Sequence, residues 1–137
     1  MKKLKTPILT TDGIVFEKGK ILLVNRDILP YKGYWVLPGG HVNYGEKVED
    51  ACRREMKEEL GINVKIKKLI GVYSNPKRDT RYHTVSVVLL CQRVKGKIHL
   101  NFEGSEFRFF SSNKLPRKIG FDHKKILSDF QKFVNIN

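Results

Sequence analysis

The stretch Gly40–Ile62, which reads GHVNYGEKVEDACRREMKEELGI, decides the fold of this 137-residue chain. It predicts a helix over Val48–Leu60, because apolar residues recur there at helical spacing and Gly61 can end the helix in a left-handed conformation. At about 100° of turn per residue, the residues that form one buried stripe of this helix are Val48, Cys52, Met56 and Leu60.

Three glutamates of the same helix occupy unusual positions. Glu55, Glu58 and Glu59 fall on and beside the edge of the buried stripe, within an arc of about 100°, and not on the opposite face where water would solvate them. Neighbours three or four positions apart repel one another by roughly a few tenths of a kcal/mol per pair. Partial burial would increase that repulsion. A bound divalent cation would remove it.

An ordinary surface helix is the competing interpretation. The glutamates could simply pair with the basic residues of the same helix, one turn away. That interpretation does not explain the Pro38–Gly40 turn ahead of the stretch, nor Glu46 and Gly61. Clustered carboxylates beside a glycine-rich turn suit a divalent metal and phosphate chemistry.

The composition is that of a basic globular chain. It has 27 Lys and Arg against 14 Asp and Glu, a formal net charge of +13 at pH 7. Such a balance favours polyanionic partners, which include nucleotides, nucleic acid and an acidic membrane face. Scattered lysines that only solubilise the surface are the alternative, so charge alone selects no function. The length predicts a single domain over residues 1–137.

Neither a membrane span nor a secreted disulfide framework is expected. The longest apolar run, Val85–Cys91, is far too short to cross a bilayer. No apolar signal region follows the basic start MKKLK. The two cysteines, Cys52 and Cys91, fit neither a disulfide framework nor a zinc site. A reducing cytoplasm is therefore the expected location, with no membrane partner.

Strands surround this helix, and a second helix is predicted over about Asp122–Val134. The predicted strands are Ile8–Phe16, Lys20–Asn25, Tyr34–Leu37, Lys65–Ser74, His83–Arg93 and Phe107–Phe110. Because only one strong helix lies among the first strands, we expect a mixed sheet. The predicted fold class is α+β, with helices packed against the sheet faces.

The opening stretch resembles the Nudix box, G-x5-E-x7-R-E-U-x-E-E-x-G-U, in which U is an aliphatic or similar residue. The residues at its fixed positions all match, and they are Gly40, Glu46, Arg54, Glu55, Met56, Glu58, Glu59, Gly61 and Ile62. A pattern with this many fixed positions is highly specific. The resemblance implies an α/β/α sandwich around a mixed β-sheet, in which the box forms a loop, a helix and a loop.

Nudix enzymes hydrolyse nucleoside diphosphates linked to another moiety, with Mg²⁺ or Mn²⁺ as cofactor. By resemblance, Glu55, Glu58 and Glu59 would bind the metal, helped by a backbone carbonyl of Gly39 or Gly40. Physical chemistry agrees, since these ions prefer oxygen ligands and keep some of their waters.

The resemblance also implies roles for residues around the metal ligands. Arg54 would hold Glu55 in position, and Glu46 would pair with Arg54 instead of binding metal. The base that deprotonates the attacking water could come from the box or from a later loop. There Glu103 is the preferred extra ligand or base and Glu106 the second choice, although a polar loop ahead of a strand would look the same. Arg26, just after a strand, could reach a phosphate or be a plain surface arginine.

The run Ser74–His83, SNPKRDTRYH, resembles the ADP-ribose pyrophosphatase branch, in which a proline at the spacing of Pro76 is common. The resemblance implies phosphate contacts for Arg78 and Arg81 and a base or ribose contact for Tyr82. Tyr82 stands where those relatives usually carry a small residue. A turn between strands is the competing interpretation of this run.

Three functions are therefore compared. The first is hydrolysis of a small-molecule nucleotide, ADP-ribose, to AMP and ribose 5-phosphate. The second keeps this chemistry but acts on nucleoside triphosphates or dinucleoside polyphosphates. The third is a non-catalytic nucleotide sensor or RNA-binding module, which the positive charge would suit. The intact set of box glutamates favours an enzyme, so nucleic acid is not the favoured partner. Many members of the branch are homodimers, and that assembly stays open.

Overall fold

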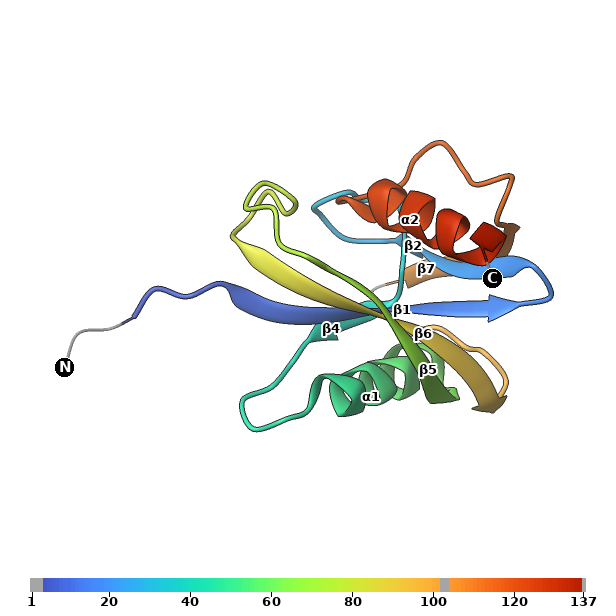
Figure 1. The fold of residues 1–137 in the computed structure, drawn as a ribbon, viewed down its shortest axis with the longest axis horizontal. Helices are drawn as coiled ribbons and strands as arrows, with labels where there is room; N and C mark the ends of the chain where they lie inside the picture. The colour runs from blue at the N-terminus through green and yellow to red at the C-terminus, as the bar shows by residue number, and fades with distance from the viewer. Residues whose placement is uncertain (1–3, 102–103, 137) are drawn as a thin grey trace.

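A mixed β-sheet with one helix on each face organises the chain (Figure 1). The structure is a computed structural model that describes residues 4–101 and 104–136. Its elements in chain order are β1 (Ile8–Glu17), β2 (Lys20–Arg26), β3 (Trp35–Val36), β4 (Gly39–His41), α1 (Val48–Leu60), β5 (Asn63–Tyr73), β6 (Thr84–Lys95), β7 (Gly104–Ser111) and α2 (His123–Ile136).

The sheet combines parallel and antiparallel pairing, as predicted. Its strands follow the order β3-β2-β1-β6-β5, while β4 pairs with β1 and β7 pairs with β2. The β1–β6 pair is parallel, with a register that runs from Ile8 opposite Thr84 to Val15 opposite Cys91. The other pairs are antiparallel.

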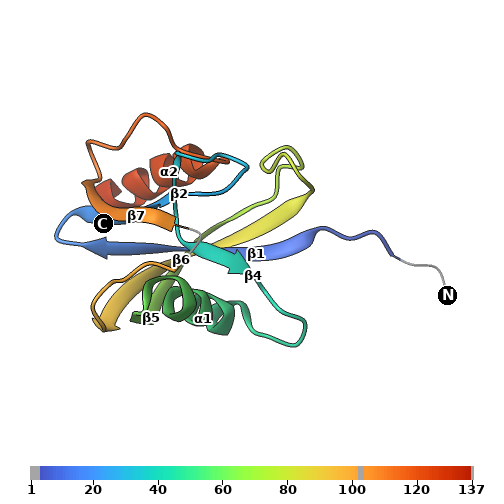
Figure 2. The same ribbon diagram turned by 180° about the vertical axis from the view of Figure 1, so that it is seen from behind.

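Alternation along the central strands creates two hydrophobic cores. Successive residues of a strand face opposite sides of a sheet, so Val15 and Leu22 pack with α1 while Ile14 and Ile21 pack with α2. Figure 2 shows the same two helices on opposite sides of the sheet from behind. The predicted α+β class and the α/β/α sandwich are confirmed.

Helix α1 has the predicted bounds, and both its end and its buried face follow from sequence. Gly61 takes φ 69°, and its N–H donates to the Lys57 carbonyl at 3.0 Å, so the helix ends where a glycine tolerates the left-handed conformation. Cys52, Met56 and Leu60 are fully buried, while Val48 is only partly buried.

The segment Gly39–His41 differs from the prediction of a turn. It forms the short strand β4, in which Gly39 lies opposite Asp12 and Gly40 opposite Thr11. A side chain at Gly39 would place its Cβ only 2.1 Å from the Thr11 carbonyl oxygen. These glycines therefore allow close backbone pairing and do not mark a turn. The other predicted elements are present, with ends shifted by at most three residues.

Within the part of the chain that the structure describes, no helix is both long and apolar enough to span a membrane.

Tight packing between β1 and α1 predicts a measurable penalty for added volume. A Cβ at Gly13 would lie 2.1 Å from Met56 Cε and 3.2 Å from the sulfurs of Cys52 and Cys91. We expect Gly13→Ala to lower the free energy of unfolding by about 1–3 kcal/mol in urea denaturation. Combining it with Met56→Leu, which removes the colliding methyl group, should recover part of the loss. Strict additivity of the two single changes would contradict this packing.

Candidate active site

One cavity of about 570 Å³ collects most of the residues that the sequence singles out. It is bounded by α1, β4, the β5–β6 loop and the start of α2. The predicted site residues that line it are Arg26, Gly39, Gly40, Glu55, Glu58, Glu59, Arg78, Arg81 and Tyr82. Further lining residues without a predicted role include Thr10, Asp12, His41, Asp79, Thr84, Asn101, Phe121 and His123.

Arg54 joins the acidic residues around the cavity. Its Nε and Nη2 donate to the two carboxylate oxygens of Glu46 at 2.8 and 3.0 Å. Its Nη1 donates to Glu55 at 2.8 Å and to Glu58 at 3.2 Å, and its Nη2 also donates to the His41 carbonyl at 2.9 Å. The fork of a guanidinium thus contacts three carboxylates and the backbone beside β4.

The Glu46–Arg54 pair stays charged over a wide pH range. The hydrogen bond from Arg54, with a second from the Asn43 N–H, lowers the pKa of Glu46 to about 2. The hydrogen bonds of Arg54 to Glu46 and Glu55, and the charges of these carboxylates, raise the pKa of Arg54 above its ordinary value. Both carboxylate oxygens of Glu46 are therefore paired with Arg54, as the box resemblance implies.

The carboxylates next to the cavity fit a divalent ion that keeps part of its water shell. Glu55 lies directly against β4, since a Cβ at Gly40 would come within 2.6 Å of both its carboxylate oxygens. Among residues 4–101 and 104–136, no three His, Cys, Asp or Glu side chains converge as a finished metal cage. Mg²⁺ needs only one or two carboxylates beside waters and substrate phosphate oxygens. Three glutamates that open onto one cavity supply such a donor set.

Glu103 lies outside the described residues, so its predicted role stays a prediction. Asn101 and Gly104, on either side of it, line a smaller cavity of about 70 Å³ that also includes Gly39 and Glu59. The Asn101 N–H donates to the Glu59 carbonyl at 2.9 Å, which brings this segment to the end of α1. The second choice, Glu106, pairs with Arg108 at 3.2 Å on β7 and is about half exposed.

Two guanidinium groups that line the same cavity lie near one aromatic ring. The Arg26 guanidinium lies 5.2 Å from the centre of the Phe121 ring, and that of Arg81 lies 5.9 Å from it. Arg81 also lies 5.0 Å from the Tyr82 ring and holds Asp79 through two nitrogens. Such cation–π contacts orient arginines over a ring face.

Arg78, for which a phosphate contact is predicted, makes its hydrogen bonds inside the protein. Its guanidinium donates to both carboxylate oxygens of Asp122, at 2.9 and 2.7 Å, and to Thr84 Oγ1 at 2.7 Å. Its side chain is only 4% exposed. This internal ion pair ties the β5–β6 loop to the start of α2, a geometry that does not favour the phosphate contact.

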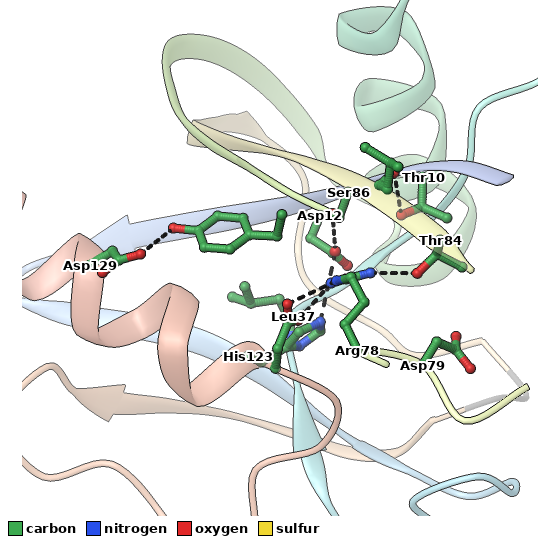
Figure 3. Close-up of polar contacts among 12 residues, drawn as sticks. Thr10, Asp12, Leu37, Arg78, Asp79, Thr84, Ser86, His123 and Asp129 are labelled. Atoms are coloured by element: carbon green, nitrogen blue, oxygen red, sulfur yellow. Dashed lines mark hydrogen bonds and ion pairs between the residues drawn. The ribbon is translucent and has the colours of Figure 1, made fainter. Parts of the chain in front are cut away.

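A buried polar network completes the cavity, and Figure 3 shows it around Asp12 and His123. The His123 ring accepts a hydrogen bond from the Leu37 N–H at its Nδ1, at 2.9 Å. Its Nε2 lies 3.8 Å from Asp12 Oδ2, which also accepts a hydrogen bond from the Ser86 hydroxyl. Burial lowers the pKa of His123, and the nearby carboxylates of Asp12 and Asp122 only partly oppose this effect.

Sequence reasoning assigned no role to Asp12 and His123. The signal for Asp12 was present, because it is a lone carboxylate within the predicted strand Ile8–Phe16. Buried charged side chains require partners. His123 belongs to the run Phe121–His123 ahead of the last helix, but only the fold brings it to Leu37.

Comparison with known proteins identifies the family. A family model described as a NUDIX domain matches residues 7–130. An ADP-ribose pyrophosphatase of Methanocaldococcus jannaschii is 44% identical over 129 residues, which cover 94% of this chain and 76% of that protein. A putative 8-oxo-dGTP diphosphatase of Bacillus subtilis is 32% identical over 120 residues, covering 86% of this chain and 75% of that protein. The crystal structure of a MutT NUDIX hydrolase from Burkholderia pseudomallei superposes with a TM-score of 0.84 at 28% identity, covering 91% of this chain and 98% of that one.

The burial of His123 predicts a pH-dependent stability. Its pKa is lowered on folding, so the unfolded chain, in which it titrates near about 6.5, binds more protons just below that pH. The free energy of unfolding should therefore fall as the pH decreases from about 6.5 to 5, by at most about 1.4 kcal/mol per pH unit. His123→Asn should flatten this slope in urea denaturation at several pH values. The other three histidines are present in both proteins, so equal slopes would contradict the prediction.

Proposed function

The chain belongs to the Nudix family, and we propose that this pyrophosphohydrolase cleaves the pyrophosphate bond of ADP-ribose to give AMP and ribose 5-phosphate. The observation that carries the proposal is one cavity lined both by Glu55, Glu58 and Glu59 and by guanidinium and aromatic groups, which are Arg26, Arg81, Tyr82 and Phe121. The relative that is 44% identical is named an ADP-ribose pyrophosphatase, which supports this choice of substrate.

The metal would bind on the acidic side of the cavity. Glu55, Glu58 and Glu59 would hold Mg²⁺ or Mn²⁺, helped by a backbone carbonyl of Gly39 or Gly40. When bound, the ion neutralises the pyrophosphate and makes a water molecule easier to deprotonate. The proton would go to one of Glu55, Glu58, Glu59 and Glu103.

The chain itself positions the reactants. The oxygen of a water molecule forms a bond to one of the two phosphorus atoms, and the bond from that phosphorus to the bridging oxygen breaks. The leaving phosphate keeps the bridging oxygen, and no covalent intermediate with the protein is needed. Arg54 contributes by holding Glu55 and Glu58 in fixed positions at the edge of the cavity.

The other side of the cavity would bind the nucleotide. Arg26 and Arg81, both oriented by Phe121, would contact the phosphates. Tyr82, which is 38% exposed, would contact the base or the ribose. Arg78 would act indirectly, because its pair with Asp122 fixes the loop that carries Arg81 and Tyr82.

Two alternative functions would be revealed by the hydrolysis screen described below. The relative named a putative 8-oxo-dGTP diphosphatase, at 32% identity, favours a nucleoside triphosphate as the second candidate substrate. RNA binding without catalysis remains the non-enzymatic alternative, on the net charge of +13.

We also propose a cytoplasmic location for the protein. Cys52 and Cys91 are free, buried thiols, which suits a cytoplasmic location. We also propose that residues 1–137 form one Nudix domain, which is either a monomer or a homodimer.

A hydrolysis screen tests the proposed substrate. ADP-ribose, NADH, diadenosine polyphosphates, dGTP and 8-oxo-dGTP would be incubated with Mg²⁺, and the products separated by anion-exchange chromatography. We expect AMP to be released fastest from ADP-ribose and EDTA to abolish its release. Turnover of triphosphates alone would replace the substrate and keep the chemistry. No turnover of any compound would overturn the proposal, and RNA affinity in the absence of Mg²⁺ would then be measured.

Removing one metal-binding carboxylate should separate catalysis from folding. We expect Glu58→Gln and Glu59→Gln each to lower kcat for ADP-ribose by about 100-fold or more. Their thermal stability should change little, because each change relieves repulsion between carboxylates and the Arg54 pair that Glu58→Gln weakens is largely exposed. Glu49→Gln, in the exposed first turn of the same helix, is the matched control and should keep full activity. Near wild-type turnover in both variants would refute the metal assignment.

A further inference from the structure

The first residue of α2 connects two segments that are far apart in sequence. His123 is 4% exposed, and its Nδ1 accepts the Leu37 N–H at 2.9 Å across 86 positions of sequence. Its other ring nitrogen lies 3.8 Å from Asp12 in β1. Figure 3 shows the His123 ring close to the labelled Leu37 and Asp12.

The Leu37 contact defines the tautomer of the ring. A nitrogen that accepts a hydrogen bond carries no proton, so the neutral ring carries its proton on Nε2. That nitrogen lies 3.8 Å from the Asp12 carboxylate, too far for a direct hydrogen bond, and the carboxylate accepts a hydrogen bond from Ser86. The Asp12 carboxylate is therefore close to both β6 and α2.

These contacts converge on the glycine strand β4. Leu37 precedes β4 by two residues, and Pro38 between them accepts the Gly13 N–H at 2.9 Å. Asp12 lies opposite Gly39 in the β1–β4 register, and a Cβ at Gly39 would lie 2.6 Å from Asp12 Oδ1. Gly40 in turn lies against the Glu55 carboxylate. The strand β4 is thus held between the Asp12–His123 pair and the glutamate helix.

We propose that His123 is a positioning residue that sets the Leu37–Gly40 backbone against Glu55 and so fixes the carbonyl groups available to the metal. This inference rests on the proposed function, since it names what aligns the same site. An apolar side chain of similar size would avoid burying a polar ring. It would, however, leave the Leu37 N–H without its acceptor, and an unpaired buried donor destabilises the arrangement that contains it.

Two conservative variants separate the two nitrogens of the ring. The amide oxygen of His123→Asn can stand near the Nδ1 position and accept the Leu37 N–H, whereas the amide of His123→Gln can replace only the Nε2–H toward Asp12. With ADP-ribose and Mg²⁺, we expect kcat of His123→Asn to stay within about threefold of wild type. We expect that of His123→Gln to fall about 10- to 100-fold with little change in KM, as is usual when a partner of a metal-binding group is lost. Equal kcat values for the two variants would overturn the proposal.

Three measurements decide the proposal without turnover. The ¹⁵N chemical shifts of the His123 ring should show a bare Nδ1 and a protonated Nε2. Amide hydrogen exchange at Leu37 should be slow in the wild type and in His123→Asn and at least about tenfold faster in His123→Gln. Mn²⁺ affinity, measured by electron paramagnetic resonance, should weaken about 10-fold or more in His123→Gln alone.

Unchanged exchange and unchanged Mn²⁺ affinity in His123→Gln would refute the positioning role, even if the protein cleaves another substrate. A wild type that binds Mn²⁺ but cleaves nothing would refute the proposed function and leave these readouts to decide the role of His123.

Discussion

Charge compensation by Arg54 is the interaction on which the rest of the site depends. Three glutamates within two helical turns repel one another, and without a counter-charge they would turn apart into solvent. Arg54 contacts Glu46, Glu55, Glu58 and the backbone of His41 at once. A lysine offers a single point charge and no planar fork, so it could not make this set of contacts. The glutamates can therefore stay close together before a metal ion binds.

The surrounding fold keeps that cluster in register with the glycine strand. The end of α1 is held by the segment after β6, where the backbone N–H groups of His99 and Asn101 donate to the carbonyls of Leu60 and Glu59. From the other side of the sheet, α2 reaches Leu37, two residues before β4, through His123. Both helices therefore contact the same short segment, Leu37–His41, although they pack in separate cores. A site whose side chains are held by both helix layers is positioned more rigidly than one held by a single loop.

Local signals in the sequence predicted much of this arrangement, and long-range contacts account for the rest. The bounds of α1 follow from helical spacing and a terminal glycine, both of which act within a few residues. The strand β4 was missed because a glycine that allows backbone pairing looks like a glycine that makes a turn. The partner of Arg78 is Asp122, which lies 44 positions away. No local pattern indicates that these two side chains meet, so the ion pair was not predicted, and the phosphate contact of Arg78 stays a prediction.

The charge of the cavity explains why a metal-dependent reaction suits this chain. The protein as a whole carries +13, which draws anionic nucleotides toward its surface. The cavity itself is different, because the ionised side chains that line it are five carboxylates, Asp12, Glu55, Glu58, Glu59 and Asp79, against three guanidinium groups, Arg26, Arg78 and Arg81. This lining has a net charge of −2, and a pyrophosphate that entered it alone would be repelled. One divalent cation bound to the glutamates would neutralise this lining, and a second would make it positive, so the site would attract the substrate more strongly once metal is bound. Under the proposed function, the metal would therefore support substrate binding as well as the activation of water.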